Sequence, residues 1–216
     1  MKFLEHGVII QFFCVHLQKF LAMDLLDRPT MIKMLEERMK NLYEHGNDDV
    51  QRLKKELERA PDDAELWFES GLAHNQSGLQ YLDMAVEKAR LEYFEAHPEA
   101  EEEPERLNVD APQAWSIFNA ALSAFDKVLE LMPEYYGVQC QRGVTLANMQ
   151  QYEEAVKCYL KALEEDEEDF SAAYYLACAY RDMGDEEQAE RYFALAKELN
   201  PDDETMCNMR GMPIEG

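Results

Sequence analysis

The feature that most constrains the fold of this chain is a pattern of small and aromatic residues that recurs with a period of about 34 residues. Its clearest copy contains Ala189, Phe193, Ala196 and Pro201. One and two periods earlier, the same residue types occur at all but two places. The two earlier copies are Ala155, Tyr159, Ala162 and Glu167, and Ala121, Phe125, Val128 and Pro133. A fixed period of this length indicates a protein built from repeated structural units.

The residue types within a unit predict two packed helices joined by a tight turn. Small residues such as Ala155 allow two helices to approach closely, and Tyr159 fills the space between them. Gly184 predicts a helix that ends in the left-handed conformation. Asp185 is the expected cap of the next helix, with Gln188 completing a capping box.

This pattern resembles the tetratricopeptide repeat family, whose unit is a helix-turn-helix of about 34 residues. The stretch AELWFESGLAHNQSG at 64–78 has the family's tryptophan at Trp67 and its glycine at Gly71, and NPDD at 200–203 is similar to its unit junction. The resemblance covers residues 62–203. It implies an all-α fold, a right-handed superhelix of tetratricopeptide-like helical hairpins (an alpha-alpha superhelix).

The segments around the regular units are less uniform. We expect an apolar N-terminal segment at 1–29, a degenerate helical hairpin at 30–61, regular units at 136–169 and 170–203, and a methionine-rich tail at 204–216. The N-terminal segment has three readings: a helix that docks on the array or on a partner, an export signal, or an extension upstream of the true start.

The middle of the chain departs from the family pattern. Residues 64–96 form the first recognisable unit, but Ala85 and Ala89 fall two positions out of phase. An acidic loop is expected at 97–111, because its prolines disfavour a regular helix. A helix from Pro112 to Leu131 follows, with Asp110 and Gln113 as the candidate caps.

The acidic charge is confined to the repeat region. The net charge of the chain is -24, and residues 1–60 are neutral, so the whole excess lies in residues 61–216. Nucleic acids require a basic surface, which argues against them as partners. The charge favours a basic or neutral protein partner, or serves solubility alone.

The sequence carries no recognisable catalytic or metal-binding motif, so we expect neither an enzyme nor a bound cofactor or metal. The acidic run EEDEED at 164–169 lacks the alternating ligands and turn glycine of a calcium loop. The five cysteines lack metal-site spacing and are expected to pack or to line a groove. Free thiols favour a reducing compartment, and the expected location is the cytoplasm. No uninterrupted apolar run is long enough to span a membrane.

In the resembling family the first helix of each unit lines a concave groove, which implies a candidate peptide-binding surface here. Its members, assigned by spacing, are Phe68, Leu72, Asn75, Gln76, Cys140, Val144, Ala147, Asn148, Tyr174, Cys178, Arg181 and Asp182. The surface is apolar with amide rims. Some of these side chains would instead be core if residues 1–22 covered them.

One family variant is not expected. Domains that grip the C-terminal carboxylate of heat-shock chaperones need lysines, an arginine and asparagines on these helices. The matching places hold Phe68, Leu72, Cys140 and Val144, with no lysine among them.

The predicted function is a non-catalytic interaction module that holds a peptide segment or a partner protein in the groove. Three alternatives stay open. The chain could be a secretion-type or co-chaperone-like protein that keeps a client soluble. It could be a self-assembling structural subunit, a homo-oligomer formed through residues 1–22. It could also be a regulatory part of an enzyme whose catalytic part lies on another chain.

Overall fold

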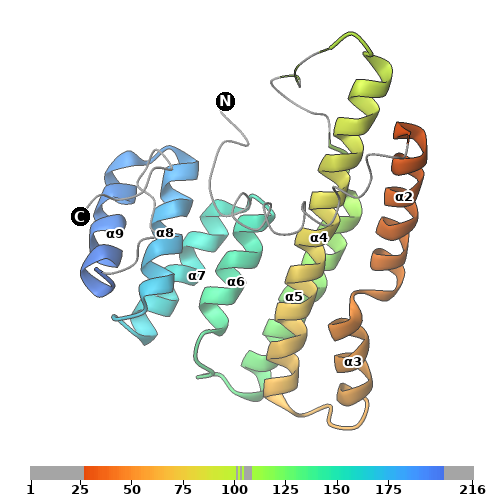
Figure 1. Ribbon diagram of the computed structural model, residues 1–216. Helices are drawn as coiled ribbons and strands as arrows, with labels where there is room; N and C mark the ends of the chain where they lie inside the picture. The colour runs from red at the N-terminus through yellow and green to blue at the C-terminus, as the bar shows by residue number, and fades with distance from the viewer. Residues whose placement is uncertain (1–26, 101, 103, 105–108, 202–216) are drawn as a thin grey trace. The chain divides into compact units, whose positions relative to one another are not determined.

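A computed structural model of the chain describes residues 27–100, 102, 104 and 109–201, and the regular structure of these residues is entirely α-helical. The predicted all-α class is therefore confirmed. The helices are α2 (Arg28–His45), α3 (Asp48–Leu57), α4 (Ala64–Ala96), α5 (Pro112–Leu131), α6 (Val138–Asn148), α7 (Tyr152–Glu165), α8 (Phe170–Met183) and α9 (Glu186–Leu199) (Figure 1). The readings of residues 1–22 and of the tail at 204–216 lie outside the described residues.

The chain divides into two compact units. The N-terminal unit contains residues 27–158, and the described residues of the C-terminal unit are 159–201. Helix α7 begins in the first unit and ends in the second. Within the described part of the chain, no helix has both the length and the apolar character needed to cross a membrane.

Helix α4 is the largest departure from the expected pattern. It is a single helix of 33 residues, where the sequence predicted a unit with a turn at 64–96. Gly78, at the place where such a unit turns, is helical and buried. No proline or capping residue follows until Asp83, so nothing local stops the helix. At 1.5 Å per residue, α4 is about 50 Å long.

Two glycines of α4 allow it to lie unusually close to α5. A Cβ atom on Gly71 would lie 2.3 Å from the ring of Phe125, and one on Gly78 would lie 2.4 Å from the ring of Phe118. Both rings are fully buried. The two glycines have the same spacing as the two phenylalanines, and the order is reversed, so the two helices run antiparallel with one contact every two turns.

The contact between Gly71 and Phe125 indicates that α4 and α5 correspond to the two helices of one repeat unit, separated by an insertion. In the C-terminal unit, Ala177 and Phe193 lie in one buried cluster and belong to a single regular hairpin. Gly71 and Phe125 play the same roles, but the chain between them is more than three times as long. The inserted residues lengthen both helices into an elongated hairpin. They also explain why the alanines after Gly78 are out of phase.

The loop predicted at 97–111 connects the far ends of this hairpin, and none of its described residues is helical. Helix α5 has the predicted bounds, but the expected caps are wrong. Ala111 occupies the capping position without a side-chain hydrogen bond. Gln113 instead accepts a hydrogen bond of 3.2 Å from the hydroxyl of Tyr81 on α4, which joins the two lengthened helices.

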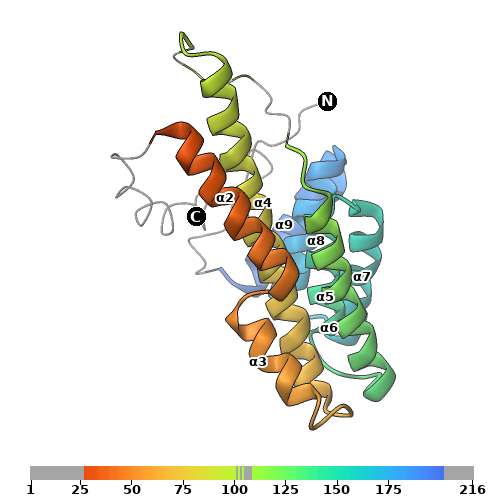
Figure 2. The same ribbon diagram turned by 90° about the vertical axis from the view of Figure 1, so that its right-hand side faces the viewer.

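The two helices predicted at 30–61 are present, but they do not fold back on each other as a hairpin. Both pack along α4, one after the other (Figures 1 and 2). Gly46, with a φ of 73°, ends α2, and the side chain of Asn47 caps α3 by accepting a hydrogen bond from the backbone of Val50. Helix α3 packs on the first half of α4, and its Leu53 is almost completely buried there.

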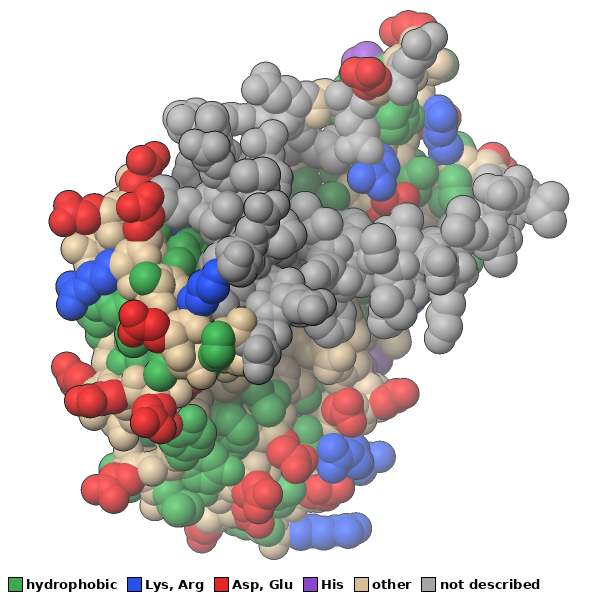
Figure 3. All heavy atoms as spheres, turned by 60° about the vertical axis from the view of Figure 1, so that its left-hand side comes forward, with side chains coloured by type: hydrophobic (Ala, Val, Ile, Leu, Met, Phe, Trp, Pro, Cys, Tyr) green, Lys and Arg blue, Asp and Glu red, His purple; other side chains and the backbone are tan. Residues whose placement is uncertain are grey.

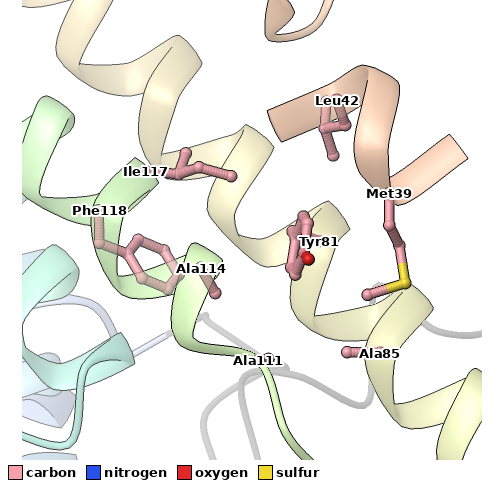
Figure 4. Packing of buried hydrophobic residues seen from close by; sticks show 8 residues of the cluster. All are labelled: Met39, Leu42, Tyr81, Ala85, Ala111, Ala114, Ile117 and Phe118. Atoms are coloured by element: carbon pink, nitrogen blue, oxygen red, sulfur yellow. The ribbon is translucent and has the colours of Figure 1, made fainter. Parts of the chain in front are cut away.

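The inserted half of the hairpin has its own core, which α2 completes. Figure 4 shows side chains of α2, α4 and the start of α5 pointing toward one another. The cluster consists of Met39, Leu42, Tyr81, Ala85, Ala111, Ala114, Ile117 and Phe118. Helix α2 therefore packs on α4 because the insertion provides an apolar surface there.

The C-terminal unit contains the helical hairpin α8–α9 that the sequence predicted. Gly184 has the expected left-handed conformation, with a φ of 82°, and Asp185 caps α9 by accepting from the backbone N–H of Gln188. Only this half of the predicted capping box is formed. The backbone N–H of Asp185 donates to the carbonyl of Tyr180, so it is not available to the side chain of Gln188.

The close approach of α4 and α5 leads to a stability prediction. In an exposed helix, replacing glycine with alanine stabilises by about 1 kcal/mol. For Gly71→Ala and Gly78→Ala we expect the opposite sign, a loss of about 1–3 kcal/mol, because the added methyl group collides with a buried ring. Urea unfolding measures this difference. Gln76→Ala, on the exposed side of the same helix, should change stability by less than about 0.5 kcal/mol. A gain in stability for both glycine variants would contradict the close approach.

Candidate functional site

Within the N-terminal compact unit, the first helices of two successive repeats lie against each other. Helices α4 and α6 are in contact, and the side chain of Asn148 donates a hydrogen bond of 3.2 Å to the side-chain oxygen of Asn75. These two residues are 73 positions apart, and both were predicted to face the groove. The structure therefore brings together the α4 and α6 parts of the predicted surface.

The α4 residues of the predicted surface differ in exposure. Leu72 is 37% exposed, which is high for a large apolar side chain, and Gln76 is also exposed. Phe68 is half-buried, with its ring centre 5.8 Å from that of Phe125 and 5.2 Å from that of Tyr135. Phe68 thus belongs partly to the core and partly to the surface.

On α6, Val144, Ala147 and Asn148 are half-buried and continue the surface. Cys140 is only 3% exposed and packs inside, as Asn75 does at 8%. The accessible part of the predicted α4–α6 surface therefore combines apolar side chains with the amides of Gln76 and Asn148, and the buried amide of Asn75 lies beneath it.

The predicted residues on α8 form a separate group in the C-terminal unit. Tyr174 packs edge-on against Phe193, with ring centres 5.9 Å apart, and Cys178 is buried. The guanidinium of Arg181 lies 3.1 Å from the carboxylate of Asp182. Burial raises the pKa of the Asp182 carboxyl, and Arg181 opposes this shift.

Sequence reasoning missed the loop between α5 and α6, which carries large exposed side chains. Met132 is 52% exposed and Tyr136 is 63% exposed. Their neighbour Tyr135 stacks near Phe68, so the loop adjoins the α4 surface. The signal that could have found it is the aromatic pair in PEYYG, which lies at a unit junction outside any helical period.

Carboxylates surround this part of the surface. Burial raises the pKa of Tyr135, and the negative charges of Glu65, Asp63 and Glu69 raise it further. Figure 3 shows acidic side chains spread over the described part of one face, with hydrophobic side chains gathered between them.

The acidic run at 164–169 has a structural role in addition to its charge. Asp169 is 8% exposed, and its side chain caps α8 by accepting from the backbone N–H of Ala172 at 2.9 Å. The last residue of the run is therefore a buried helix cap, whereas Glu164, Glu165, Glu167 and Glu168 are exposed. Among the residues that the structure describes, no three His, Cys, Asp or Glu side chains are grouped so that they could hold a metal ion.

Stacked helical hairpins with a surface on their first helices define a helical-repeat scaffold for protein interactions. Two tetratricopeptide repeat models match the chain, one at residues 138–169 and the other at 158–191. Residues 138–191 therefore contain tetratricopeptide repeats, as the repeat period predicted. Repeats of this kind support a role as a protein-interaction or scaffold module.

The chain is also similar to individual proteins. It is 30% identical over 110 residues to protein bimA of Emericella nidulans, a match that covers 45% of this chain and 14% of the length of bimA. Among solved structures, MamA (residues 41–end) from Desulfovibrio magneticus RS-1 has a TM-score of 0.48 and 18% identity, over 79% of this chain and 76% of that one. TTC0263, a tetratricopeptide protein of Thermus thermophilus, has a TM-score of 0.42 and 17% identity, over 82% of this chain and 93% of that one.

His74, on α4 between the surface residues, leads to a prediction about pH. Its Nδ1 atom lies 2.7 Å from the carbonyl oxygen of Ser70. Burial lowers the pKa of His74 below its usual value, although this hydrogen bond acts in the opposite direction. The folded state therefore binds a proton less readily than the unfolded state, and stability should fall as the pH drops below about 6.5.

Urea unfolding at about pH 7.5 and about pH 5.5 measures this loss. We expect His74→Gln to lose less stability than the natural chain over this interval, since glutamine does not titrate. Equal losses in the two proteins would show that His74 does not contribute to the pH dependence.

Proposed function

We propose that this chain is a non-catalytic module that holds a peptide segment of a partner protein against helices α4 and α6. The main support is the exposure of Leu72 on α4 together with the half-buried Val144 and Ala147 on α6, because these two helices are in contact. An apolar side chain of a bound peptide would remove Leu72 from water, and burial of this kind is the main source of affinity in peptide grooves.

The amide pair of Asn75 and Asn148 gives this surface a fixed base. Their hydrogen bond joins α4 to α6, so the apolar side chains around it keep a constant spacing. A surface that is already organised loses little conformational entropy on binding. The remaining donors and acceptors of Asn148, which is half-buried, are suited to the backbone of an extended peptide.

The C-terminal unit is proposed to contribute a polar contact of its own. Tyr174 is held between neighbouring aromatic rings, and Arg181 is paired with Asp182. A peptide bound to α8 itself would meet an aromatic face and a charge pair.

The proposal is tested with peptides selected from a random library on the immobilised full chain. Leu72→Arg should weaken their binding about tenfold, because it replaces apolar contact area with a charge. Fluorescence anisotropy of the labelled peptides measures the change. Met34→Arg is the matched control, since Met34 is 43% exposed on α2 of the same unit.

Unchanged affinity in the control and a loss in Leu72→Arg would support the proposed surface. If both variants bind the selected peptides as the natural chain does, the peptides bind elsewhere and the proposal is wrong. Thermal unfolding of both variants shows whether a loss of binding is due to misfolding.

A further inference from the structure

The apolar surface of α4 continues onto the loop between α5 and α6. Leu72 lies one helical turn after Phe68, whose ring packs near Tyr135 of the loop. In the same loop, Met132 and Tyr136 are 52% and 63% exposed. Large apolar side chains that are exposed together in this way mark interaction sites.

Carboxylates predominate in the two segments that form this surface. Residues 61–72 contain four carboxylates and residues 132–137 contain one, and neither segment has a lysine or an arginine. Among the described residues, Glu65 and Glu134 form no ion pair with a basic side chain. Glu69 does pair, at 3.6 Å, with Arg52, which also contacts two carboxylates of α3.

Two basic side chains near this edge, Lys127 and Arg52, are paired with carboxylates of their own helices. Lys127 lies 2.8 Å from Glu130, and Arg52 lies 3.2 Å from Glu56. Glu65 and Glu134 therefore place negative charge beside the aromatic surface, and no ion pair among the described residues offsets these two carboxylates. An exposed tyrosine ring beside carboxylates attracts a cation through both its π face and the surrounding charge.

We propose that the surface formed by Leu72, Phe68, Tyr135, Tyr136 and Met132 binds a segment that alternates apolar residues with lysine or arginine. This inference rests on the proposed function and specifies the chemistry of the peptide. The apolar side chains of the segment lie on Leu72 and Met132, and its cations lie over Tyr136 and beside Glu65 and Glu134. An acidic segment is excluded from the same surface by repulsion.

The test uses the full chain and three short fluorescein-labelled peptides, one alternating leucine with lysine and two in which glutamine or glutamate replaces lysine. The lysine peptide should bind about fivefold more tightly than the glutamine peptide, and the glutamate peptide should not bind. The double variant Glu65→Gln, Glu134→Gln should remove the preference for the lysine peptide without weakening binding of the glutamine peptide.

A charge-matched control separates the local effect from the net charge of the chain. Glu153, in the first turn of α7, and Glu167, in the loop before α8, are both exposed. Glu153→Gln, Glu167→Gln removes the same charge at other places and should leave the preference intact. Tyr136→Ala should weaken binding of the lysine peptide about threefold. Tyr136→Phe keeps the aromatic ring and should leave this binding unchanged.

Each failure has a distinct meaning. If the control pair lowers binding as much as Glu65→Gln, Glu134→Gln, the preference comes from net charge and this inference is overturned. Library peptides that need Leu72 but bind equally well after their lysines and arginines are replaced by glutamine also overturn it, and they leave the proposed function standing. If no peptide shows binding that depends on Leu72, both proposals are wrong.

Discussion

The packing of two buried phenylalanine rings against two glycines of α4 is the contact on which the N-terminal unit depends. Phe125 on Gly71 and Phe118 on Gly78 fix how closely α4 and α5 approach and in which register. That register places the end of α5, and with it the loop that follows, beside the first turns of α4. Phe68 then meets Tyr135, and the candidate surface acquires its aromatic edge.

The insertion has a second effect, on the helices before the hairpin. In a regular array, α2 would fold back onto α3. Here the lengthened half of α4 presents Tyr81 and Ala85, and α2 covers them with Met39 and Leu42 instead. The inserted residues therefore lengthen the repeat formed by α4 and α5. They also keep α2 from packing on α3 in the preceding part of the chain. The candidate surface stays on the uninserted half of α4, where α6 is in contact.

The sequence was sufficient where neighbouring residues determine the structure. The repeat period predicted the hairpin of α8 and α9, and Gly184 and Asp185 predicted its turn. It was insufficient for α4, because the pairing of Gly71 with Phe125 bridges a long insertion and leaves no local signal. For the site, the family resemblance, carried over by spacing, placed Asn75 and Asn148 on one surface, and the two side chains are hydrogen-bonded. The loop tyrosines were missed because they belong to no helical period.

The split unit also changes how the chain must fold. In a regular repeat the two helices meet after a short connection, so each unit can form from its own neighbours. Here the contact between Gly71 and Phe125 closes a segment more than three times as long as the one between Ala177 and Phe193. The entropy of closing the longer segment adds roughly 1 kcal/mol. Helix formation in α8 and α9 can therefore precede the N-terminal unit, whose hairpin is assembled from distant parts of the chain and forms more slowly.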